Sequence, residues 1–332
     1  MCGIIGIYNY KNNKLITSHI QSGLKSLQHR GQDSYGYYFG SEKENKIIRE
    51  IGLIKNHKIE NQYQIGLGHT RYATSYLSKS EDINSYIQPL KGNNKHLGDF
   101  YLIHNGNINN LKSLVNQFNL PNRYLDGYND SQILVKIIEL CDDTKINHIL
   151  KKIINTVDGI FNLIIYQIDI NNLFFLKDKF GNRPLCIGTN DYGFCIASES
   201  VALGNYEYLR EVNNGELVLI NKDGLKTIYQ NRNYSQVCLF EYIYLQNKNS
   251  KVSSKHLQIE YDKNYCSVED IRIKFGEILG MKEKNHLLHQ LNEIVVIGAP
   301  NTGIPIGKAF AKVNSFRYYQ FFTIFNIFYN VI

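Results

Sequence analysis

The chain opens with Met1-Cys-Gly-Ile-Ile-Gly-Ile-Tyr8, where a nucleophilic side chain directly precedes an apolar run. Residues 3–8 are rich in isoleucine, which is typical of a buried β-strand. The segment that follows has an apolar residue at every third or fourth position and reaches Gly31, and this spacing predicts an amphipathic helix that ends before that glycine. A strand and then a helix therefore begin the fold.

Further strand-like runs follow along the first two-thirds of the chain. They are rich in Ile, Phe, Tyr and Leu, they are bounded by Gly, Asn and Asp, and they lie at residues 47–54, 65–69, 101–104, 161–168, 173–176, 194–197 and 217–220. A second helix is predicted from Asp130 or Ser131 to Cys141. Because strands outnumber helices and are joined by short connections, we predict an α+β domain of stacked antiparallel sheets with helices packed outside.

The last third of the chain has a different pattern. Residues 246–254 are polar and have the composition of a linker. Beyond them, a helix over 267–279, the apolar run Glu293-Ile-Val-Val-Ile-Gly298 and a helix over 306–313 predict the opening of an α/β domain. The predicted organisation is therefore a first domain, a linker and a partial second domain, at residues 2–235, 236–254 and 255–332.

Composition limits the class of protein. Of 332 residues, 43% are hydrophobic and 20% are charged, which is enough to form a core and excludes general disorder. The formal net charge of +7 is spread thinly, so we expect no nucleic-acid partner and no membrane partner. The six cysteines are widely spaced and no segment resembles a signal peptide. We therefore predict a cytoplasmic protein without a disulfide framework or a zinc ribbon.

Cys2 is a candidate nucleophile. If Met1 is removed, this cysteine carries a thiol with an ordinary pKa of about 8.5 beside an α-amine with an ordinary pKa of about 7.7–8.0. An N-terminal amine can serve as the base for the side-chain nucleophile next to it. A cysteine at this position can also occur by chance, so the interpretation depends on which residues the fold brings near it.

Other segments place polar residues where a strand or helix ends, which is the usual place for binding residues. Each also has a structural explanation by itself: a surface ion pair for Arg30 or Arg71, a turn at Asn105-Gly106, and a helix N-cap at Asp130. The segments are His29-Arg-Gly-Gln-Asp-Ser34, Gly68-His-Thr-Arg-Tyr-Ala-Thr74, His104-Asn-Gly-Asn107 and Asn129-Asp-Ser-Gln132.

Together with Cys2, these segments resemble the glutaminase domain of class II glutamine amidotransferases, whose nucleophile is N-terminal. The resemblance extends to about residue 233 and includes Lys177-Asp-Lys-Phe-Gly-Asn-Arg-Pro-Leu185, Ala197-Ser-Glu-Ser200 and Asn214-Gly-Glu216. It implies that the first domain is a four-layer αββα sandwich of antiparallel sheets, the fold of N-terminal-nucleophile hydrolases, and that the substrate is glutamine.

The resemblance implies catalytic roles for three residues. Cys2 Sγ would attack the side-chain amide of glutamine while the amine of the same residue moves the proton. The Asn105 side chain and the Gly106 backbone N–H would form the oxyanion hole. A tetrahedral oxyanion needs donors aimed at it, and an Asn-Gly sequence allows a backbone N–H to approach closely.

It also implies the substrate-binding residues. Arg71 would hold the α-carboxylate of glutamine and Asp130 its α-ammonium, which suits a zwitterion because arginine is the better fork for a carboxylate. Arg30 and Gly31 would support the loop of the nucleophile, and Thr74 completes the predicted set.

Three segments indicate which acceptor receives the ammonia. They are similar to segments of the amidophosphoribosyltransferases, and they are Leu27-Gln-His-Arg-Gly-Gln-Asp-Ser34, Val237-Cys-Leu-Phe-Glu-Tyr-Ile-Tyr-Leu245 and Ile294-Val-Val-Ile-Gly-Ala-Pro-Asn-Thr-Gly-Ile-Pro305. The resemblance implies a step of de novo purine biosynthesis in which ammonia is transferred to phosphoribosyl pyrophosphate to give 5-phosphoribosylamine. It also implies a type I phosphoribosyltransferase domain of the α/β class, Mg²⁺ bound with phosphoribosyl pyrophosphate, and a homo-oligomer if the second domain is completed.

The second domain departs from this pattern. It lacks a hydrophobic strand that ends in two adjacent acids before a turn of Gly and Thr, and from Asn314 onward it resembles no part of the family. We therefore expect an incomplete acceptor domain without the Mg²⁺ site, no metal or cofactor in the glutaminase domain, and no iron–sulfur cluster, although Cys238 stands where a cluster ligand can lie. Two alternatives stay open: a stand-alone glutaminase that supplies a separate partner, and an inactive truncated paralogue that acts through subunit assembly.

Overall fold

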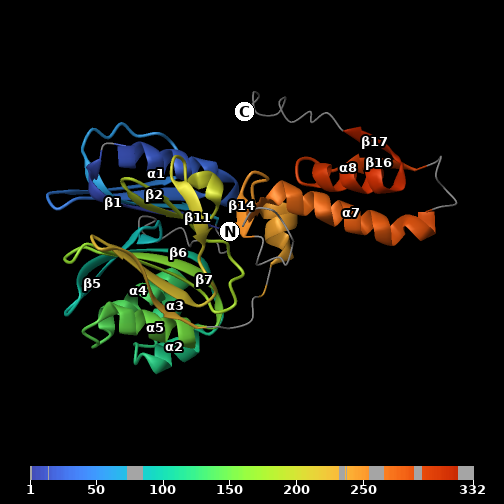
Figure 1. Cartoon of the computed structure of the whole chain (residues 1–332). Coiled ribbons are helices and arrows are strands. Elements are labelled where there is room, and N and C mark those ends of the chain that lie inside the picture. Colours follow the sequence, from blue (N-terminus) through green and yellow to red (C-terminus); the bar gives the residue numbers. More distant parts are fainter. Residues whose placement is uncertain are drawn as a thin grey trace. The chain divides into compact units, whose positions relative to one another are not determined.

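The chain forms two compact units, residues 1–238 and 239–332 (Figure 1). The computed structural model describes residues 2–13, 15–72, 85–231, 236, 238–253, 265–287 and 294–320. Within these ranges the first unit contains two large antiparallel sheets, and the second contains a pair of packed helices with two small sheets.

The first large sheet contains the start of the chain. In the described residues its strand order is β11-β9-β10-β1-β4-β2-β3, with β1 between β10 and β4. Both faces of β1 are covered, because Ile4 and Tyr8 contact the second sheet while Ile5 and Ile7 contact a helix on the other side. This explains why the opening sequence is apolar throughout and does not alternate. The strands are β1 Gly3–Asn13, β2 Ser34–Gly40, β3 Asn45–Ile51, β4 Tyr63–Arg71, β9 Cys186–Asn190, β10 Gly193–Ala197 and β11 Glu207–Glu211.

The second large sheet has the strand order β13-β12-β8-β7-β6-β5 in the described residues, again with antiparallel neighbours. Its strands are β5 Leu90–Asn94, β6 Gly98–Ile108, β7 Gly159–Gln167, β8 Asn172–Lys177, β12 Glu216–Asn221 and β13 Gly224–Gln230. The helices of the first unit are α1 Leu15–Ser26, α2 Leu111–Gln117, α3 Tyr124–Gly127, α4 Asp130–Leu140 and α5 Ile146–Thr156, with short 3₁₀ turns η1 Gln28–Arg30 and η3 Ser200–Ala202.

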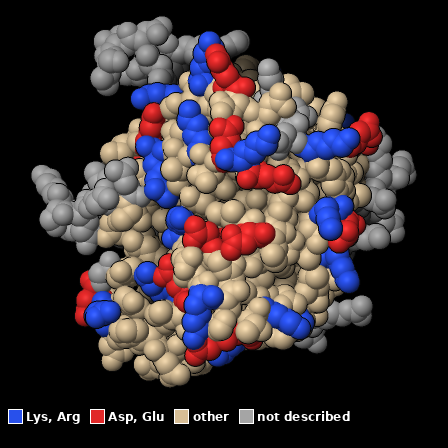
Figure 2. All heavy atoms as spheres, turned by 90° about the vertical axis from the view of Figure 1, so that its left-hand side faces the viewer, with Lys and Arg blue, Asp and Glu red and all other residues tan. Residues whose placement is uncertain are grey.

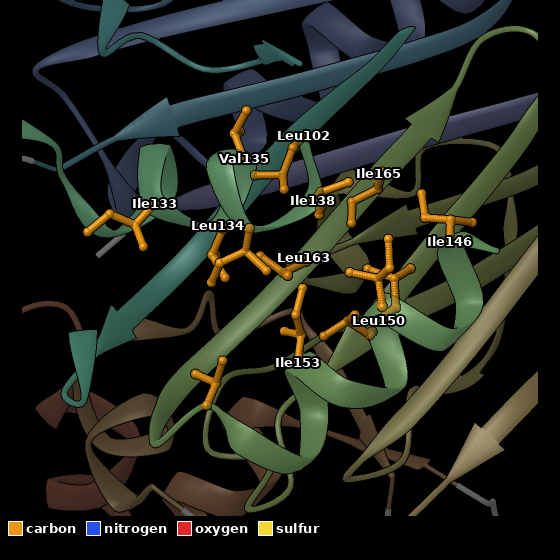
Figure 3. Packing of buried hydrophobic residues seen from close by; sticks show 14 of the residues in the cluster. Leu102, Ile133, Leu134, Val135, Ile138, Ile146, Leu150, Ile153, Leu163 and Ile165 are labelled. Atoms are coloured by element: carbon orange, nitrogen blue, oxygen red, sulfur yellow. The ribbon is translucent and has the colours of Figure 1, made fainter. Parts of the chain in front are cut away.

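Three hydrophobic clusters stack these elements into four layers. One cluster lies between α1 and the first sheet, one between the two sheets, and one between the second sheet and helices α2, α4 and α5. Figure 3 shows the last of these, with Leu150 and Ile153 of α5 directed toward Leu163 and Ile165 of β7. Fully burying an aliphatic side chain of this size contributes about 1.5–3 kcal/mol. The first unit therefore has the predicted arrangement of stacked antiparallel sheets with helices outside.

The second unit contains a parallel strand–helix–strand arrangement. Strand β16 (Val295–Gly298) pairs in parallel with β17 (Arg317–Gln320), and α8 (Gly303–Asn314) joins them. Helix α7 (Val268–Leu287) packs closely on α8, since a Cβ atom at Gly276 would lie 2.2 Å from the carbonyl oxygen of Ile306. The range predicted as a linker contains a π-helical turn, η4 (Glu241–Leu245), and a short strand, β14 (Lys251–Ser253). Strand β14 pairs with β15 (Tyr265–Ser267), which lies beyond that range.

The surface of the first unit has mixed charge. Figure 2 shows one face, on which Lys and Arg side chains alternate with Asp and Glu side chains rather than gathering by sign. In the described parts of the chain, none of the helices combines the length and the apolar composition that a membrane crossing needs.

Candidate active site

A cavity of about 340 Å³ lies in the first unit, where the start of β1 meets the end of β4. Segments far apart in the sequence form its lining. It includes five of the residues that the sequence analysis selected, Cys2, Arg71, Asn105, Gly106 and Asp130, and also Gln88, His104, Ser131 and Arg183. Chemistry-bearing side chains from both sheets and from the start of α4 are thus brought together at one place.

Cys2 directly precedes β1, and its neighbour Gly3 pairs with Thr70 near the end of β4. Burial raises the pKa of the Cys2 thiol, while a backbone hydrogen bond from Tyr72 and the positive charge of Arg71 act in the opposite direction. The net result is a raised pKa, so the thiol is protonated at neutral pH. A thiolate is the reactive form, and the residue therefore needs a base to become a nucleophile.

Buried charges hold the start of β1. Arg30 donates through Nε to the carbonyl oxygen of Cys2 at 3.2 Å and through Nη1 to Oε1 of Glu199 at 2.6 Å. The side chains of Arg30 and Glu199 are both 0% exposed. Ser198 adds two bonds to the same strand, because the N–H of Ile4 donates to Ser198 Oγ at 3.0 Å and the N–H of Ser198 donates to the carbonyl of Ile4 at 2.9 Å. Arg30 thus acts on the nucleophile's backbone and does not line the cavity.

Gly31 allows the end of β4 to approach closely. A Cβ atom at Gly31 would lie 2.6 Å from the carbonyl carbon of Arg71 and 2.7 Å from its oxygen. Thr70 Oγ1 donates to the carbonyl of Gly31 at 2.8 Å, and the N–H of Asp33 donates to the carbonyl of Arg71 at 3.0 Å. The backbone that carries Arg71 is therefore fixed by residues just beyond η1. Thr74, which the resemblance adds to the set, lies outside the described residues.

The second sheet contributes the backbone of Gly106. Strand β5 pairs with β6 only over residues 98–102, and beyond this point the N–H of His104 donates to Oε1 of Gln88 at 2.5 Å. In an antiparallel strand the backbone groups of alternate residues point to the same edge, so the N–H of Gly106 points to the edge that β7 does not occupy. A Cβ atom at Gly106 would lie 2.1 Å from the carbonyl oxygen of Ile160, and only glycine therefore fits this position.

Asn105 has an unusual side-chain environment. It is 1% exposed, and neither Oδ1 nor Nδ2 has a hydrogen-bond partner among the described residues. Leaving a buried polar group unsatisfied costs about 1–3 kcal/mol, so native proteins seldom do so without a functional reason. An amide that lines a cavity in this state is available to a ligand.

Asn129 caps the N-terminus of α4. The sequence alone also allowed Asp130 as this cap, and the structure shows that it is not. Asn129 Oδ1 accepts from the N–H of Gln132 at 2.9 Å, and Gln132 Oε1 accepts from the N–H of Asn129 at 2.9 Å, a complete capping box. Asp130 is therefore not needed as the cap. Its Oδ1 accepts from the N–H of Ser131 at 2.8 Å, and its side chain remains 22% exposed at the cavity.

A buried polar network connects α4 to β6. Ser131 Oγ lies 2.8 Å from Nδ1 of His104 and accepts from Nε2 of Gln88 at 3.1 Å. Burial lowers the pKa of His104, against the opposing effect of Asp130, so this imidazole is neutral at neutral pH. The network links the backbone of β6 to the residue next to Asp130.

Several residues in or next to the site have no role assigned from the sequence. Arg183 and Glu199 lie within segments that carried the family resemblance, and that resemblance was the available signal for them. Gln88 lies in no such segment, and Ser131 was noted only beside Asp130. In the part of the chain that the structure describes, no three His, Cys, Asp or Glu side chains come together as a metal-ligand group.

Comparison with known proteins assigns the family. Residues 42–255 match the glutamine amidotransferase domain, so the chain belongs to the glutamine amidotransferase family. Within it, the chain is a class II glutamine amidotransferase related to the amidophosphoribosyltransferases.

Sequence identity and coverage show how similar the chain is to known amidophosphoribosyltransferases. The chain is 27% identical to the amidophosphoribosyltransferase of Methanocaldococcus jannaschii over 96% of this chain and 68% of that protein. The amidophosphoribosyltransferase of Haemophilus influenzae is 28% identical over 97% of this chain and 65% of that protein. The amidophosphoribosyltransferase of Staphylococcus aureus is 28% identical over 94% of this chain and 60% of that protein. A solved glutamine phosphoribosylpyrophosphate amidotransferase from B. subtilis, complexed with ADP and GMP, has a TM-score of 0.76 at 25% identity over 96% of this chain and 65% of that chain. The chain thus spans between 60% and 68% of the lengths of these curated relatives.

Proposed function

We propose that the protein hydrolyses glutamine at Cys2 and supplies the ammonia to phosphoribosyl pyrophosphate, which is the reaction of an amidophosphoribosyltransferase. One observation carries the glutamine half of this proposal. The nucleophile, two oxyanion donors, a cation and an anion line one cavity although they come from separate segments of the chain.

The chemistry starts once Met1 has been removed. The α-amine of Cys2 accepts the thiol proton as Sγ bonds to the carbonyl carbon of the glutamine side chain. The negative oxygen of the tetrahedral intermediate accepts hydrogen bonds from Nδ2 of Asn105 and the N–H of Gly106. The amine then returns the proton to the leaving nitrogen, and ammonia departs as the thioester forms. Water cleaves the thioester to release glutamate and the free thiol.

Substrate recognition uses two charged side chains that line the same cavity as Cys2. The Arg71 guanidinium pairs with the α-carboxylate of glutamine and the Asp130 carboxylate pairs with its α-ammonium. Two observations support these roles. The backbone of Arg71 is braced by Gly31 and Asp33, and the capping box of Asn129 leaves the Asp130 carboxylate to the cavity.

The part of the proposal that concerns the ammonia acceptor is supported by the relatives described above, which are amidophosphoribosyltransferases. The chain spans 60% to 68% of their lengths. The resemblance implies that Mg²⁺ binds together with phosphoribosyl pyrophosphate. In the described ranges no three His, Cys, Asp or Glu side chains lie close enough together to hold a metal ion. None of the steps above involves Mg²⁺. Glutamine hydrolysis without transfer is a second candidate, because every residue that lines the cavity belongs to the unit 1–238.

The test uses protein with a C-terminal tag, after mass spectrometry has verified that Met1 is absent. Wild type should release glutamate from glutamine, and Cys2→Ala should not. Undiminished glutamate release from Cys2→Ala would contradict the assignment of the nucleophile. Adding phosphoribosyl pyrophosphate with Mg²⁺ and assaying for phosphoribosylamine separates the two candidates, because a hydrolase alone makes none.

A further inference from the structure

We propose that Glu199 is a positioning residue for Cys2. Through Arg30 it fixes the carbonyl of Cys2, and thereby the orientation of the thiol and the α-amine toward the cavity. This inference rests on the proposed function, since the role of Glu199 is defined by the nucleophile that it helps to hold.

The contacts form a continuous path from Glu199 to the nucleophile. Oε1 of Glu199 accepts from Nη1 of Arg30 at 2.6 Å and lies 2.8 Å from Nε2 of His29. The same guanidinium donates through Nε to the carbonyl of Cys2 at 3.2 Å. Glu199 immediately precedes η3, and its neighbour Ser198 is hydrogen-bonded to Ile4 in both directions. The carboxylate therefore projects from a backbone that is itself attached to β1.

The nucleophile needs such support because of its place in the chain. After removal of Met1, Cys2 is a terminal residue attached by one peptide bond, and chain ends are poorly ordered unless other groups hold them. The carbonyl that Arg30 contacts belongs to that single peptide bond. Arginine suits the task, because its planar fork can present one N–H to a carboxylate and another to a carbonyl in a fixed relation.

The negative charge of Glu199 balances the positive charge of the buried Arg30 guanidinium. Burial raises the pKa of its carboxyl group, but the hydrogen bond from His29 and the charge of Arg30 outweigh burial and lower the pKa to about 2. The carboxylate is therefore ionised at neutral pH. Glu199→Gln keeps the shape of the side chain but leaves the buried guanidinium facing a neutral amide, and removing one partner of a buried ion pair is strongly disruptive.

The experiment compares Glu199→Gln with wild type by kinetics and binding. We expect kcat for glutamate release to fall about tenfold or more, which corresponds to one weakened hydrogen bond to a charged group. Glutamine affinity, measured by calorimetry in a Cys2→Ala background, should change by less than about twofold, because Arg71 and Asp130 are retained. A purely structural role would not separate turnover from binding in this way.

A direct readout is available because Cys-Gly occurs once in the sequence, at Cys2-Gly3. Labelling with carbonyl-¹³C cysteine and ¹⁵N glycine gives a single correlation peak for this peptide bond. We expect the peak to shift in Glu199→Gln, since the carbonyl of Cys2 changes its hydrogen bonding. Arg30→Lys, which keeps the charge but loses the fork, should shift it as well and provides the test if Glu199→Gln does not fold.

Glu216→Gln is the matched control. Glu216 is 1% exposed and pairs with Arg210 through two bonds of 2.8 Å, but it does not line the cavity. This variant should lose stability while keeping kcat and the Cys2-Gly3 peak. The proposal is overturned if Glu199→Gln or Arg30→Lys leaves the peak unmoved, if kcat stays within about twofold of wild type, or if Glu216→Gln has the same effects. A wild type that releases no glutamate would instead refute the proposed function, and the peak would still report whether Glu199 positions Cys2.

Discussion

Replacing Asn105 with leucine should lower turnover and at the same time raise stability. The side chain is 1% exposed, and both of its amide atoms are without a partner among the described residues. An unsatisfied buried polar group costs about 1–3 kcal/mol, and an apolar group of the same shape does not carry that cost. We therefore expect Asn105→Leu to stabilise the first unit by about 1–2 kcal/mol. For a unit of this size this corresponds to a rise in melting temperature of roughly 2–8 °C.

The loss of activity follows from the same geometry. If Nδ2 of Asn105 donates to the oxyanion, leucine removes one of the donors that stabilise the transition state. The loss of one such donor typically lowers kcat by about 10²–10³. Calorimetric melting and glutamate release, measured on the same preparation, provide the two values.

Asn162 is the control for stability because it lies directly opposite Asn105 in the pairing of β6 with β7. It is 0% exposed, and its Oδ1 has no partner among the described residues, but its Nδ2 donates to the carbonyls of Pro184 at 2.9 Å and Arg183 at 3.4 Å. Asn162→Leu should therefore destabilise the fold by about 1 kcal/mol, since it leaves the partly buried carbonyl of Pro184 without its donor. If Asn105→Leu melts as low as Asn162→Leu, or keeps kcat within about tenfold of wild type, then Asn105 is a structural residue and the reasoning is wrong.

Three further variants test other parts of the site. Arg71→Lys should raise the glutamine KM about tenfold or more, because the planar fork is lost and a charged hydrogen bond is worth ~1.5–3 kcal/mol; an unchanged KM would exclude contact with the carboxylate. Gly31→Ala should also raise KM, since its Cβ would lie 2.6 Å from the carbonyl carbon of Arg71 and displace it; steady-state kinetics on folded protein would detect this. The Glu199 pKa of about 2 lies below the ordinary value, so its stabilisation is present above pH ~4.3 and is lost as the pH falls toward 2. The urea midpoint of wild type should then fall more steeply with acid than that of Glu199→Gln, and equal slopes would contradict an ionised buried carboxylate.

The sequence predicts many strands of the first unit, from long and short apolar runs alike. The predicted runs at 3–8 and 161–168 fall within or closely match β1 and β7, and the four-residue runs at 101–104, 173–176, 194–197 and 217–220 fall within β6, β8, β10 and β12. Strand β2 is not predicted, because its seven residues include two glycines and no Ile, Leu or Val. Helix α5 was also missed, although Ile146, Ile149, Leu150, Ile153 and Ile154 have helical spacing. The composition of β2 hides the strand, because glycine is depleted in strands, whereas the helical spacing of α5 is present in the sequence.

The site was predictable where short motifs carry it. Arg71, Asn105 and Asp130 stand in compact segments at the ends of elements, and these segments carry the family resemblance. Gln88 could not be found in this way, because its contacts are with the backbone of His104 and the side chain of Ser131 on two other elements. Such a role exists only once the sheet brings those elements together, and no local pattern records it.

The geometry of the site depends on the layer between the two sheets. Cys2 directly precedes β1 and Arg71 ends β4, both in the first sheet, while Asn105 and Gly106 belong to β6 of the second sheet. The nucleophile and the oxyanion donors therefore come from different sheets and line one cavity. The cluster between the sheets, which includes Ile4, Leu67, Ile103 and Ile164, sets their separation. Ile4 is two residues from Cys2 and Ile103 is two residues from Asn105, so a change in packing there moves both halves of the reaction centre. Close-packed cores transmit such shifts because they have few voids that could absorb them. The apolar run at the start of the chain thus has two consequences: it forms a central strand, and it places a cysteine at a fixed distance from the donors on the other sheet.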